Sequence, residues 1–237
     1  MVIQDLHVNV ECVGEGQAVI LLHGWGQNMY MMKFIQYHLS NNYQVLNLDL
    51  PGFGKSEEPH QIWSIWDYAN FLTHLLEAYH IKNPIIIAHS FGARIAIAYA
   101  LHHSCKALVL TGAAGILPKR TLRYYQKVWT YKLLKRLHIP LHMGSQDYQA
   151  ASSIMKGVLV SCVNEDLQPY LSKLSCKTLL VWGEKDQQTP MWMGQKMKEE
   201  IPNASLVVFR NEGHFAYFHQ SLRFQGVIDH FFKEESL

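Results

Sequence analysis

Few cysteines occur in this chain, and none is placed to pair with another in a recognisable motif. The 237 residues contain four dispersed cysteines without a C-x-x-C pair: Cys12, Cys105, Cys162 and Cys176. Disulfide frameworks and thiolate metal sites need denser or closer spacing. We therefore expect four reduced thiols and no structural disulfide.

Long apolar runs are also missing. The first sixteen residues lack the basic stretch and apolar core of a secretory signal, and no apolar run approaches the ~18 residues that a membrane span needs. We predict a cytoplasmic protein with no integral membrane segment.

An excess of charge of either sign is absent too. Lys and Arg number 21 against 19 Asp and Glu, and charged residues are 17% of the chain while hydrophobic residues are 49%. This balance excludes a disordered chain and a generally nucleic-acid-binding surface. Since the chain also lacks repeats and low-complexity linkers, its length fits one α/β domain of roughly 200–250 residues.

What the sequence does contain is a series of short apolar runs, each stopped by Gly, Asp or His, which predicts buried strands of a parallel sheet. The runs are 18–24, 43–52, 84–90, 106–112, 177–186 and 205–214. Before them, apolar and polar residues alternate from Leu6 to Cys12. That alternation predicts one half-exposed strand at an antiparallel edge, ending at the turn of residues 14–16.

Helical patterns separate these runs, at roughly 28–40, 64–80, 91–103, 190–201 and 217–234. Alternating strands and helices predict an α/β fold, with a mostly parallel sheet covered by helices on both faces. In such sheets ligands bind beyond the carboxyl ends of the strands. The residues that follow each strand are therefore the candidates for function.

The alternation stops after the run at 106–112. Residues 113–175 carry no clear strand, and 117–138 hold seven Lys or Arg and no Asp or Glu. We predict a helical cap at 113–175, inserted into a core made of 1–112 and 176–237. The basic side chains fit either the solvated face of this cap or a site that attracts an acidic partner.

Two glycine-rich segments fail the spacing of phosphate-binding loops. A G-x-G-x-x-G motif that begins at Gly24 needs a glycine at position 29, where this chain has Met29. A P-loop that ends at 54–56 needs a glycine at position 49, where this chain has Asp49. We do not expect nucleotide binding. No H-E-x-x-H motif is present, so no metal site is expected. No organic cofactor is expected either.

Ser90 stands where the apolar run 84–90 meets the next helical pattern. A serine in that place is favoured as a helix N-cap. A sharp strand-to-helix turn would instead lift its hydroxyl above the sheet edge, beside helix amides with partial positive charge. Asp186 and His214 follow two later strands, and an activated serine needs both an imidazole base and a carboxylate that orients it.

These motifs and their order resemble the α/β-hydrolase family along essentially the whole chain. Five segments carry the resemblance: 23–26 as the oxyanion loop, 49–56 as the turn after the next strand, 88–92 as the nucleophile elbow, 182–190 as the acid loop and 211–218 as the histidine loop. The elbow departs from the family's G-x-S-x-G pattern by having Ala88 in place of the first glycine.

The resemblance implies a role for each candidate. Ser90 is the expected nucleophile, His214 the general base and Asp186 its orienting carboxylate. The backbone N–H groups of Trp25 and Phe91 are expected to form the oxyanion hole. Because relatives sometimes take the acid from an earlier position, Glu165 and Asp166 stay open as alternatives to Asp186.

The resemblance further implies the capped serine esterase and lipase-like branch of the family. We expect a carboxylesterase that cleaves esters of small or medium acyl groups through an acyl-enzyme. A C–C bond hydrolase of diketone ring-cleavage products and a non-catalytic receptor for small ligands stay open as alternatives on the same fold. As in relatives that cleave carrier-bound esters, the basic cap suggests an acidic acyl-carrier partner.

Overall fold

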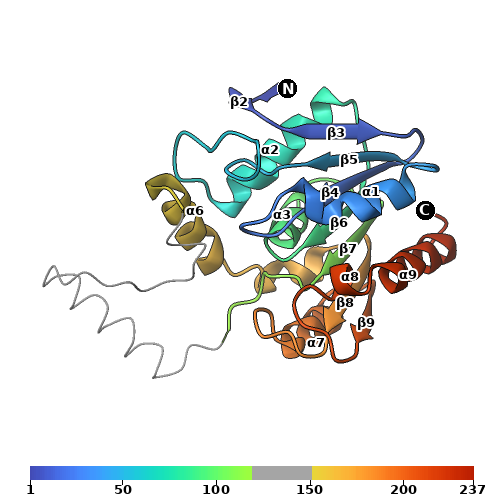
Figure 1. The fold of residues 1–237 in the computed structure, drawn as a ribbon. Coiled ribbons are helices and arrows are strands. Elements are labelled where there is room, and N and C mark those ends of the chain that lie inside the picture. The colour runs from blue at the N-terminus through green and yellow to red at the C-terminus, as the bar shows by residue number, and fades with distance from the viewer. Residues whose placement is uncertain (119–150) are drawn as a thin grey trace, which may run out of the picture.

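A seven-stranded sheet forms the centre of the computed structural model, which describes residues 1–118 and 151–237 (Figure 1). The spatial order is β3-β5-β4-β6-β7-β8-β9. The strands are β3 (Val10–Val13), β4 (Ala18–Leu22), β5 (Gln44–Leu48), β6 (Ile85–His89), β7 (Ala107–Thr111), β8 (Lys177–Gly183) and β9 (Ala204–Phe209). β3 pairs antiparallel with β5, and the remaining neighbours pair in parallel, which confirms the predicted α/β architecture.

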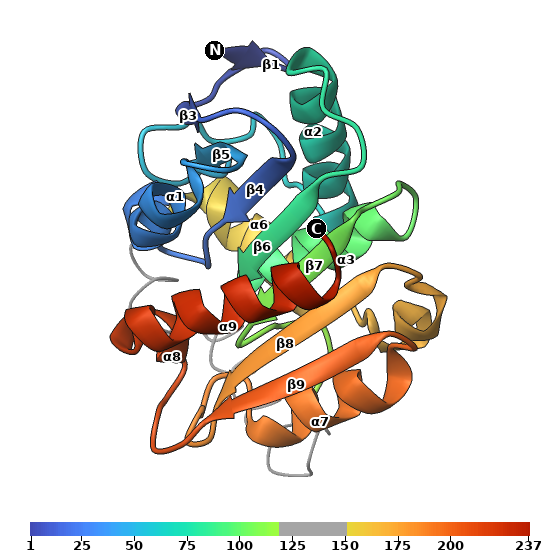
Figure 2. The same ribbon diagram turned by 90° about the vertical axis from the view of Figure 1, so that its right-hand side faces the viewer.

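Helices cover both faces of this sheet (Figure 2). On one face lie α1 (Lys33–Leu39) with the short η1 (Met29–Met32) before it, α8 (Ala216–His219) and α9 (Ser221–Glu234). On the other lie α2 (Ile65–Ala78), α3 (Phe91–Ala100) and α7 (Met191–Glu200). Strand side chains alternate between the faces, so that Val19 and Leu21 pack toward α9 while Ile20 and Leu22 pack toward α2 and α3.

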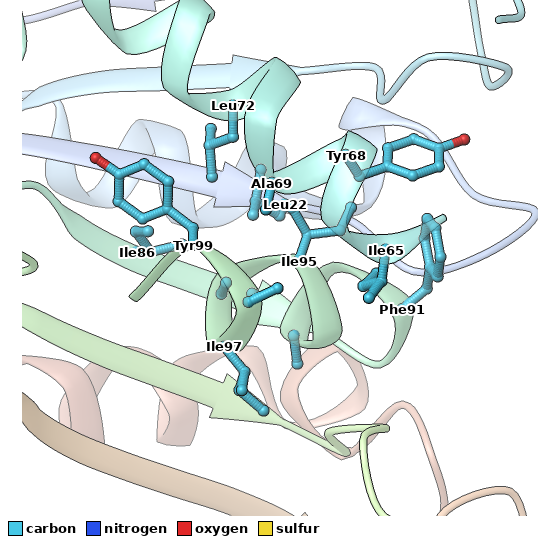
Figure 3. Close-up of a cluster of buried hydrophobic side chains, with 14 of the residues drawn as sticks. Leu22, Ile65, Tyr68, Ala69, Leu72, Ile86, Phe91, Ile95, Ile97 and Tyr99 are labelled. Atoms are coloured by element: carbon cyan, nitrogen blue, oxygen red, sulfur yellow. The ribbon is translucent and has the colours of Figure 1, made fainter. Parts of the chain in front are cut away.

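The larger of the two cores lies between α2, α3 and the sheet (Figure 3). Its side chains come from β4, α2, β6 and α3, and they include Leu22, Ile65, Tyr68, Leu72, Ile86, Phe91, Ile95 and Ile97. α2 begins at a capping box, in which the Ser64 hydroxyl accepts from the Asp67 N–H and the Asp67 carboxylate accepts from the Ser64 N–H. This packing fixes α3, whose N-terminus carries Ser90.

The N-terminal strand differs from the prediction. Instead of one strand from Leu6 to Cys12, the structure has β1 (Val2–Ile3) and β2 (Leu6–His7) paired in a separate small sheet, and β3 begins at Val10. The antiparallel edge is confirmed for β3 alone. Two predicted helices are also interrupted, since η1 precedes α1 and Gln220 separates α8 from α9.

Between β7 and β8 the described residues contain α6 (Ser153–Asn164) and η2 (Gln168–Lys173). α6 packs on the segment after β5, because a Cβ at Gly52 would lie 2.4 Å from Met155 Sδ and one at Gly157 would lie 2.4 Å from Ile62 Cδ1. Most of the predicted cap and of the basic stretch falls on 119–150, outside the described residues, so the cap boundaries stay a prediction. No helix in the described ranges is long and apolar enough to cross a bilayer.

The strand order places a crevice at the carboxyl ends of β4 and β6. β5 lies on one side of β4 and β6 on the other, so the chain reverses its direction of winding between these two strands. Ligands of open α/β sheets bind at such a reversal. β4 is followed by the loop 23–26 and β6 by Ser90, which puts two of the predicted motifs at this point.

Candidate active site

Ser90 sits in a strained turn and does not cap its helix. Its φ is 48° and its ψ is −104°, and its side chain makes no capping hydrogen bond to α3. A residue other than glycine held in such a conformation costs about 1–3 kcal/mol, and strain of this kind clusters at functional sites. The Ser90 N–H donates to Thr111 O at 3.0 Å, which ties the turn to the end of β7. Ser90 therefore occupies the N-cap position of α3, but its hydroxyl makes none of the hydrogen bonds of a capping serine.

Asp186 and His214 are in direct contact. His214 Nδ1 lies 2.8 Å from Asp186 Oδ2, and the histidine is 7% exposed. With the Nδ1 proton donated to the carboxylate, Nε2 keeps the lone pair that a general base needs. Two loops bring them together, one after β8 and one after β9, and Gly183 allows the close approach, since a Cβ there would lie 2.0 Å from Gly213 O.

Four donors hold the Asp186 carboxylate. Oδ1 accepts from the backbone N–H groups of Gln188 and Thr189, both at 2.9 Å, and Oδ2 accepts from the Thr189 hydroxyl at 2.8 Å in addition to His214. Burial would raise the pKa of Asp186, but the hydrogen bonds and charge of His214 and the bonds from Thr189 outweigh it and lower the pKa below its usual value. The carboxylate is therefore ionised and fixed.

The two alternative acids lie elsewhere. Glu165 Oε1 accepts from Trp66 Nε1 at 3.3 Å, and Asp166 Oδ1 accepts from the Gln168 N–H at 3.1 Å. Of the three carboxylates weighed from the sequence, Asp186 is the one that the structure pairs with His214.

Shared neighbours bring Ser90 close to His214. A Cβ at Gly112, the residue after the Ser90 partner Thr111, would lie 3.1 Å from His214 Nδ1. The ring of His89, the residue before Ser90, lies 4.7 Å from the His214 ring between centroids. No hydrogen bond joins Ser90 Oγ to His214 in the part of the chain that the structure describes. Such bonds are often long before substrate binds and tighten in the complex.

The two expected oxyanion donors lie side by side, Trp25 on the loop after β4 and Phe91 at the start of α3. The rings of Trp25 and Phe91 meet edge to face with centroids 5.2 Å apart. Phe91 is the first residue of α3, so its N–H has no partner within the helix and carries the positive end of the helix dipole. Both residues line the same pocket as Ser90.

Two buried groups hold the loop that carries Trp25 and the turn after β5. His23 Nδ1 donates to Gly24 O at 2.8 Å, and His23 Nε2 accepts from the Leu50 N–H at 3.0 Å. Asp49 accepts from the N–H groups of Met29 and Lys55, at 2.7 and 2.8 Å. The glycine-rich segment 52–56 thus wraps around a carboxylate of its own chain, which excludes it as a phosphate loop.

Ser90 opens into a pocket of about 610 Å³, a volume typical of small-molecule sites. Its wall is mainly apolar, with contributions from Phe91, Ala114, Ile116, Leu117, Pro118, Leu159, Val163, Pro190 and Met193. Polar groups come from Arg94, Asn164, Gln187, Gln188 and Thr189. Across the described ranges no group of three or more His, Cys, Asp or Glu side chains could hold a metal ion.

Two residues of this site were not predicted from the sequence. Thr189 orients Asp186 through both its backbone and its hydroxyl, and Arg94 is a buried cation in the pocket wall. For Arg94 the sequence does hold a signal, because it is the single charged residue within the apolar helix Phe91–Ala100.

Comparison with known proteins agrees with the fold described above. A model of the alpha/beta hydrolase fold family matches residues 17–162, and a model of TAP-like proteins matches 164–237. YisY of Bacillus subtilis, an AB hydrolase superfamily protein, is 26% identical with 94% of each chain covered.

Solved structures give the same result. A meta-cleavage product hydrolase from Pseudomonas fluorescens IP01 superposes with a TM-score of 0.79 at 25% identity, over 98% of this chain and 96% of its own. An esterase from Exiguobacterium antarcticum superposes with a TM-score of 0.78 at 25% identity, over 98% and 97%. The chain belongs to the α/β-hydrolase fold family.

Proposed function

We propose that this protein is a serine hydrolase that cleaves carboxylic esters of small or medium acyl groups, with Ser90, His214 and Asp186 as its catalytic triad. One observation carries the proposal: an ionised, buried carboxylate holds the His214 imidazole, and Ser90, in a strained turn nearby, lines an apolar pocket. An apolar wall with few polar groups suits an acyl chain.

The reaction follows from the roles of these groups. His214 Nε2 takes the Ser90 proton as Oγ attacks the ester carbonyl carbon, and it then gives that proton to the departing alcohol oxygen as the C–O bond breaks. The acyl group is left on Ser90. A water molecule, deprotonated by His214, then attacks the acyl carbon. The bond between this carbon and Ser90 Oγ breaks, the acid leaves, and His214 returns the proton to Ser90 Oγ.

In this proposal the Trp25 and Phe91 N–H groups stabilise the negative oxygen of both tetrahedral intermediates. A preorganised donor of this kind typically contributes about 2.7–4 kcal/mol to transition-state stabilisation. The donors cost no rearrangement during the reaction, because α3 and the packed rings of Trp25 and Phe91 already fix them.

A second candidate is the hydrolysis of a C–C bond in a diketone. The similarity to a meta-cleavage product hydrolase supports it, since that relative matches this chain as well as an esterase does. The same serine, base and oxyanion donors would serve either bond. A comparison of kcat/KM for p-nitrophenyl butyrate and for a 2-hydroxy-6-oxo-dienoate separates the two activities.

The first prediction concerns Ser90. The Ser90→Ala variant should lose p-nitrophenyl ester hydrolysis and labelling by a serine-directed fluorophosphonate, because the nucleophile is absent. Its free energy of unfolding should not fall, since the Ser90 hydroxyl caps no helix. Hydrolysis rates, gel fluorescence and urea unfolding measure the three effects.

Ser64 provides a matched control, because it is a serine at the start of a helix and does cap it. Ser64→Ala should keep hydrolysis and labelling but lose about 1 kcal/mol of stability. Normal ester cleavage by Ser90→Ala would refute the triad. Absence of labelling in the wild type, together with tight binding of a small ester, would instead indicate a non-catalytic receptor.

A further inference from the structure

Arg94 places a positive charge in the wall of the pocket that holds Ser90. It is 5% exposed and lies in α3, four positions after Ser90, among buried apolar neighbours such as Ala93 and Ile95. A guanidinium remains protonated in proteins. Burial lowers the pKa of Arg94, which reflects the cost of keeping this charge away from water.

The protein itself supplies little compensation for this charge. Arg94 Nη1 donates to the carbonyl oxygen of Glu165, at the C-terminal end of α6, with a distance of 2.7 Å. The charges of Glu165 and Asp166 offset part of the effect of burial on the pKa of Arg94, but these carboxylates accept hydrogen bonds from Trp66 and Gln168 and not from Arg94. Within residues 1–118 and 151–237, no carboxylate forms an ion pair with Arg94.

A buried charge without an ionic partner is unusual. Buried ionised groups are normally paired, because an uncompensated charge in the interior is strongly destabilising. A single neutral carbonyl engages one of the five N–H donors of a guanidinium. Since Arg94 lines the pocket, a molecule bound there can reach the remaining donors.

We propose that Arg94 binds a carboxylate of the substrate, so that the site takes acyl compounds that carry a free carboxylate, such as monoesters of short dicarboxylic acids. The proposal rests on the hydrolase function proposed above. A guanidinium fork matches a carboxylate with two parallel hydrogen bonds. Four residues of helix rise about 6 Å, so a short chain would join the ester carbonyl at Ser90 to the carboxylate at Arg94.

Substrates that differ only in charge test this proposal. Monomethyl esters of succinic, glutaric and adipic acid carry a carboxylate, whereas the dimethyl esters of the same acids do not. We expect the wild type to prefer the monoester at one of these lengths, measured as the ratio of kcat/KM by proton release. Arg94→Gln should lower that ratio at least tenfold, mainly through KM, because a binding contact is lost.

Two further variants sharpen the test. Arg94→Lys should give an intermediate ratio, since it keeps the charge but loses the planar fork. Arg223→Gln removes an exposed arginine of α9 and should leave the ratio unchanged. If Arg94→Gln lowers kcat/KM for both esters by the same factor, Arg94 acts only through the Glu165 carbonyl and the proposal is wrong.

Binding of free glutarate separates this proposal from the proposed function. Glutarate should raise the unfolding temperature of the wild type and of Ser90→Ala, but not of Arg94→Gln. That pattern without any ester hydrolysis would keep the carboxylate site and reject the hydrolase. Ester hydrolysis with no monoester preference and no glutarate effect in the wild type would keep the hydrolase and reject the carboxylate site, even if Arg94→Gln fails to fold.

Discussion

Thr189 fixes the acid that orients His214. Its hydroxyl oxygen lies 2.8 Å from Asp186 Oδ2 and 3.1 Å from Gly112 O, and its N–H donates to Asp186 Oδ1. Thr189 therefore connects the acid loop to the residue that follows β7, next to the Ser90 turn. The same side chain touches Asp186 and lines the pocket.

Removing these contacts should lower kcat without unfolding the protein. Asp186→Asn should reduce ester turnover roughly 10³–10⁴-fold, because a neutral amide neither fixes the tautomer of His214 nor stabilises its charged form. Thr189→Val should reduce kcat about tenfold or more, since a hydrogen bond to a charged group contributes about 1.5–3 kcal/mol. Steady-state kinetics with p-nitrophenyl butyrate measure both.

Thr189→Ser is the matched control, because it keeps the hydroxyl and removes only the methyl group. It should retain most of the wild-type kcat. Wild-type turnover in Thr189→Val would show that the two backbone N–H groups and His214 hold Asp186 without the hydroxyl.

At this scale the sequence predicts residues whose role follows from their place in the chain. Ser90, Asp186 and His214 each follow a strand, and parallel strands end at one edge of the sheet. The roles of Thr189 and Arg94 depend instead on what they touch across the fold, namely Asp186 and the end of α6. Spacing along the chain does not encode those contacts.

The close contact between α3 and β4 depends on Gly92. A Cβ at this position would lie 2.5 Å from Leu22 O and 2.7 Å from His23 O, closer than real Cβ atoms approach backbone. The helix that carries Phe91 and Arg94 can therefore lie against β4 only if residue 92 lacks a side chain. A Cβ at Gly226, in α9, would meet no atom of the described residues within 4 Å, so a side chain fits at that position.

The two glycines should respond oppositely to the same substitution. Gly92→Ala should destabilise the protein by about 1–3 kcal/mol, because α3 must move away from β4. Gly226→Ala should stabilise it by about 0.5–1 kcal/mol, because alanine loses less backbone entropy in a helix. Urea unfolding gives both values, and equal effects of the two substitutions would refute the packing argument.

The alternation of apolar and polar residues does not predict the break between β2 and β3. Asn9 donates its N–H to Ser56 Oγ at 2.9 Å, and its side chain donates to Asp49 Oδ2 at 2.7 Å. Asn9 O still accepts from the Asp49 N–H at 2.9 Å, but the Asn9 N–H goes to Ser56 and not to the neighbouring backbone, so the regular ladder begins only at Val10. Apolar residues still alternate through the break, so the sequence predicts one strand where long-range hydrogen bonds produce two.

For the whole molecule, periodicity predicts the layers but not the strand order. The six buried runs and the five helical stretches each correspond to observed elements. Which strand lies next to β4 depends on how two cores close around the sheet, one with α2, α3 and α7 and the other with α1 and α9. That arrangement sets the reversal between β4 and β6, and with it the place of Ser90.

Two buried histidines couple the stability of the whole fold to pH. Burial lowers the pKa of His23 to about 4 and that of His89 to about 3. For His23, the hydrogen bond to Gly24 O and the charge of Asp49 oppose this shift only in part. A proton on His23 Nε2 would also face the Leu50 N–H, from which that nitrogen now accepts a hydrogen bond.

The free energy of unfolding should therefore fall as the pH drops. In the unfolded chain each histidine takes up a proton below pH about 6.5. In the folded protein the two buried imidazoles stay neutral until the pH reaches their lower pKa values. Acid therefore favours unfolding. For His23, the free energy of unfolding falls by about 3 kcal/mol between pH 6.5 and about 4. Above pH 6.5 His23 makes no such contribution to the pH dependence.

Urea unfolding between pH 7 and pH 4.5 tests this coupling. His23→Asn should be less stable at pH 7, because Asn cannot bridge Gly24 and Leu50, but its stability should fall less steeply with acid than that of the wild type. His60→Asn, which changes an exposed histidine, should keep the wild-type slope. If the His23 variant kept the full slope, the acid sensitivity would arise elsewhere, and the loop that carries Trp25 would not need a neutral imidazole beneath it.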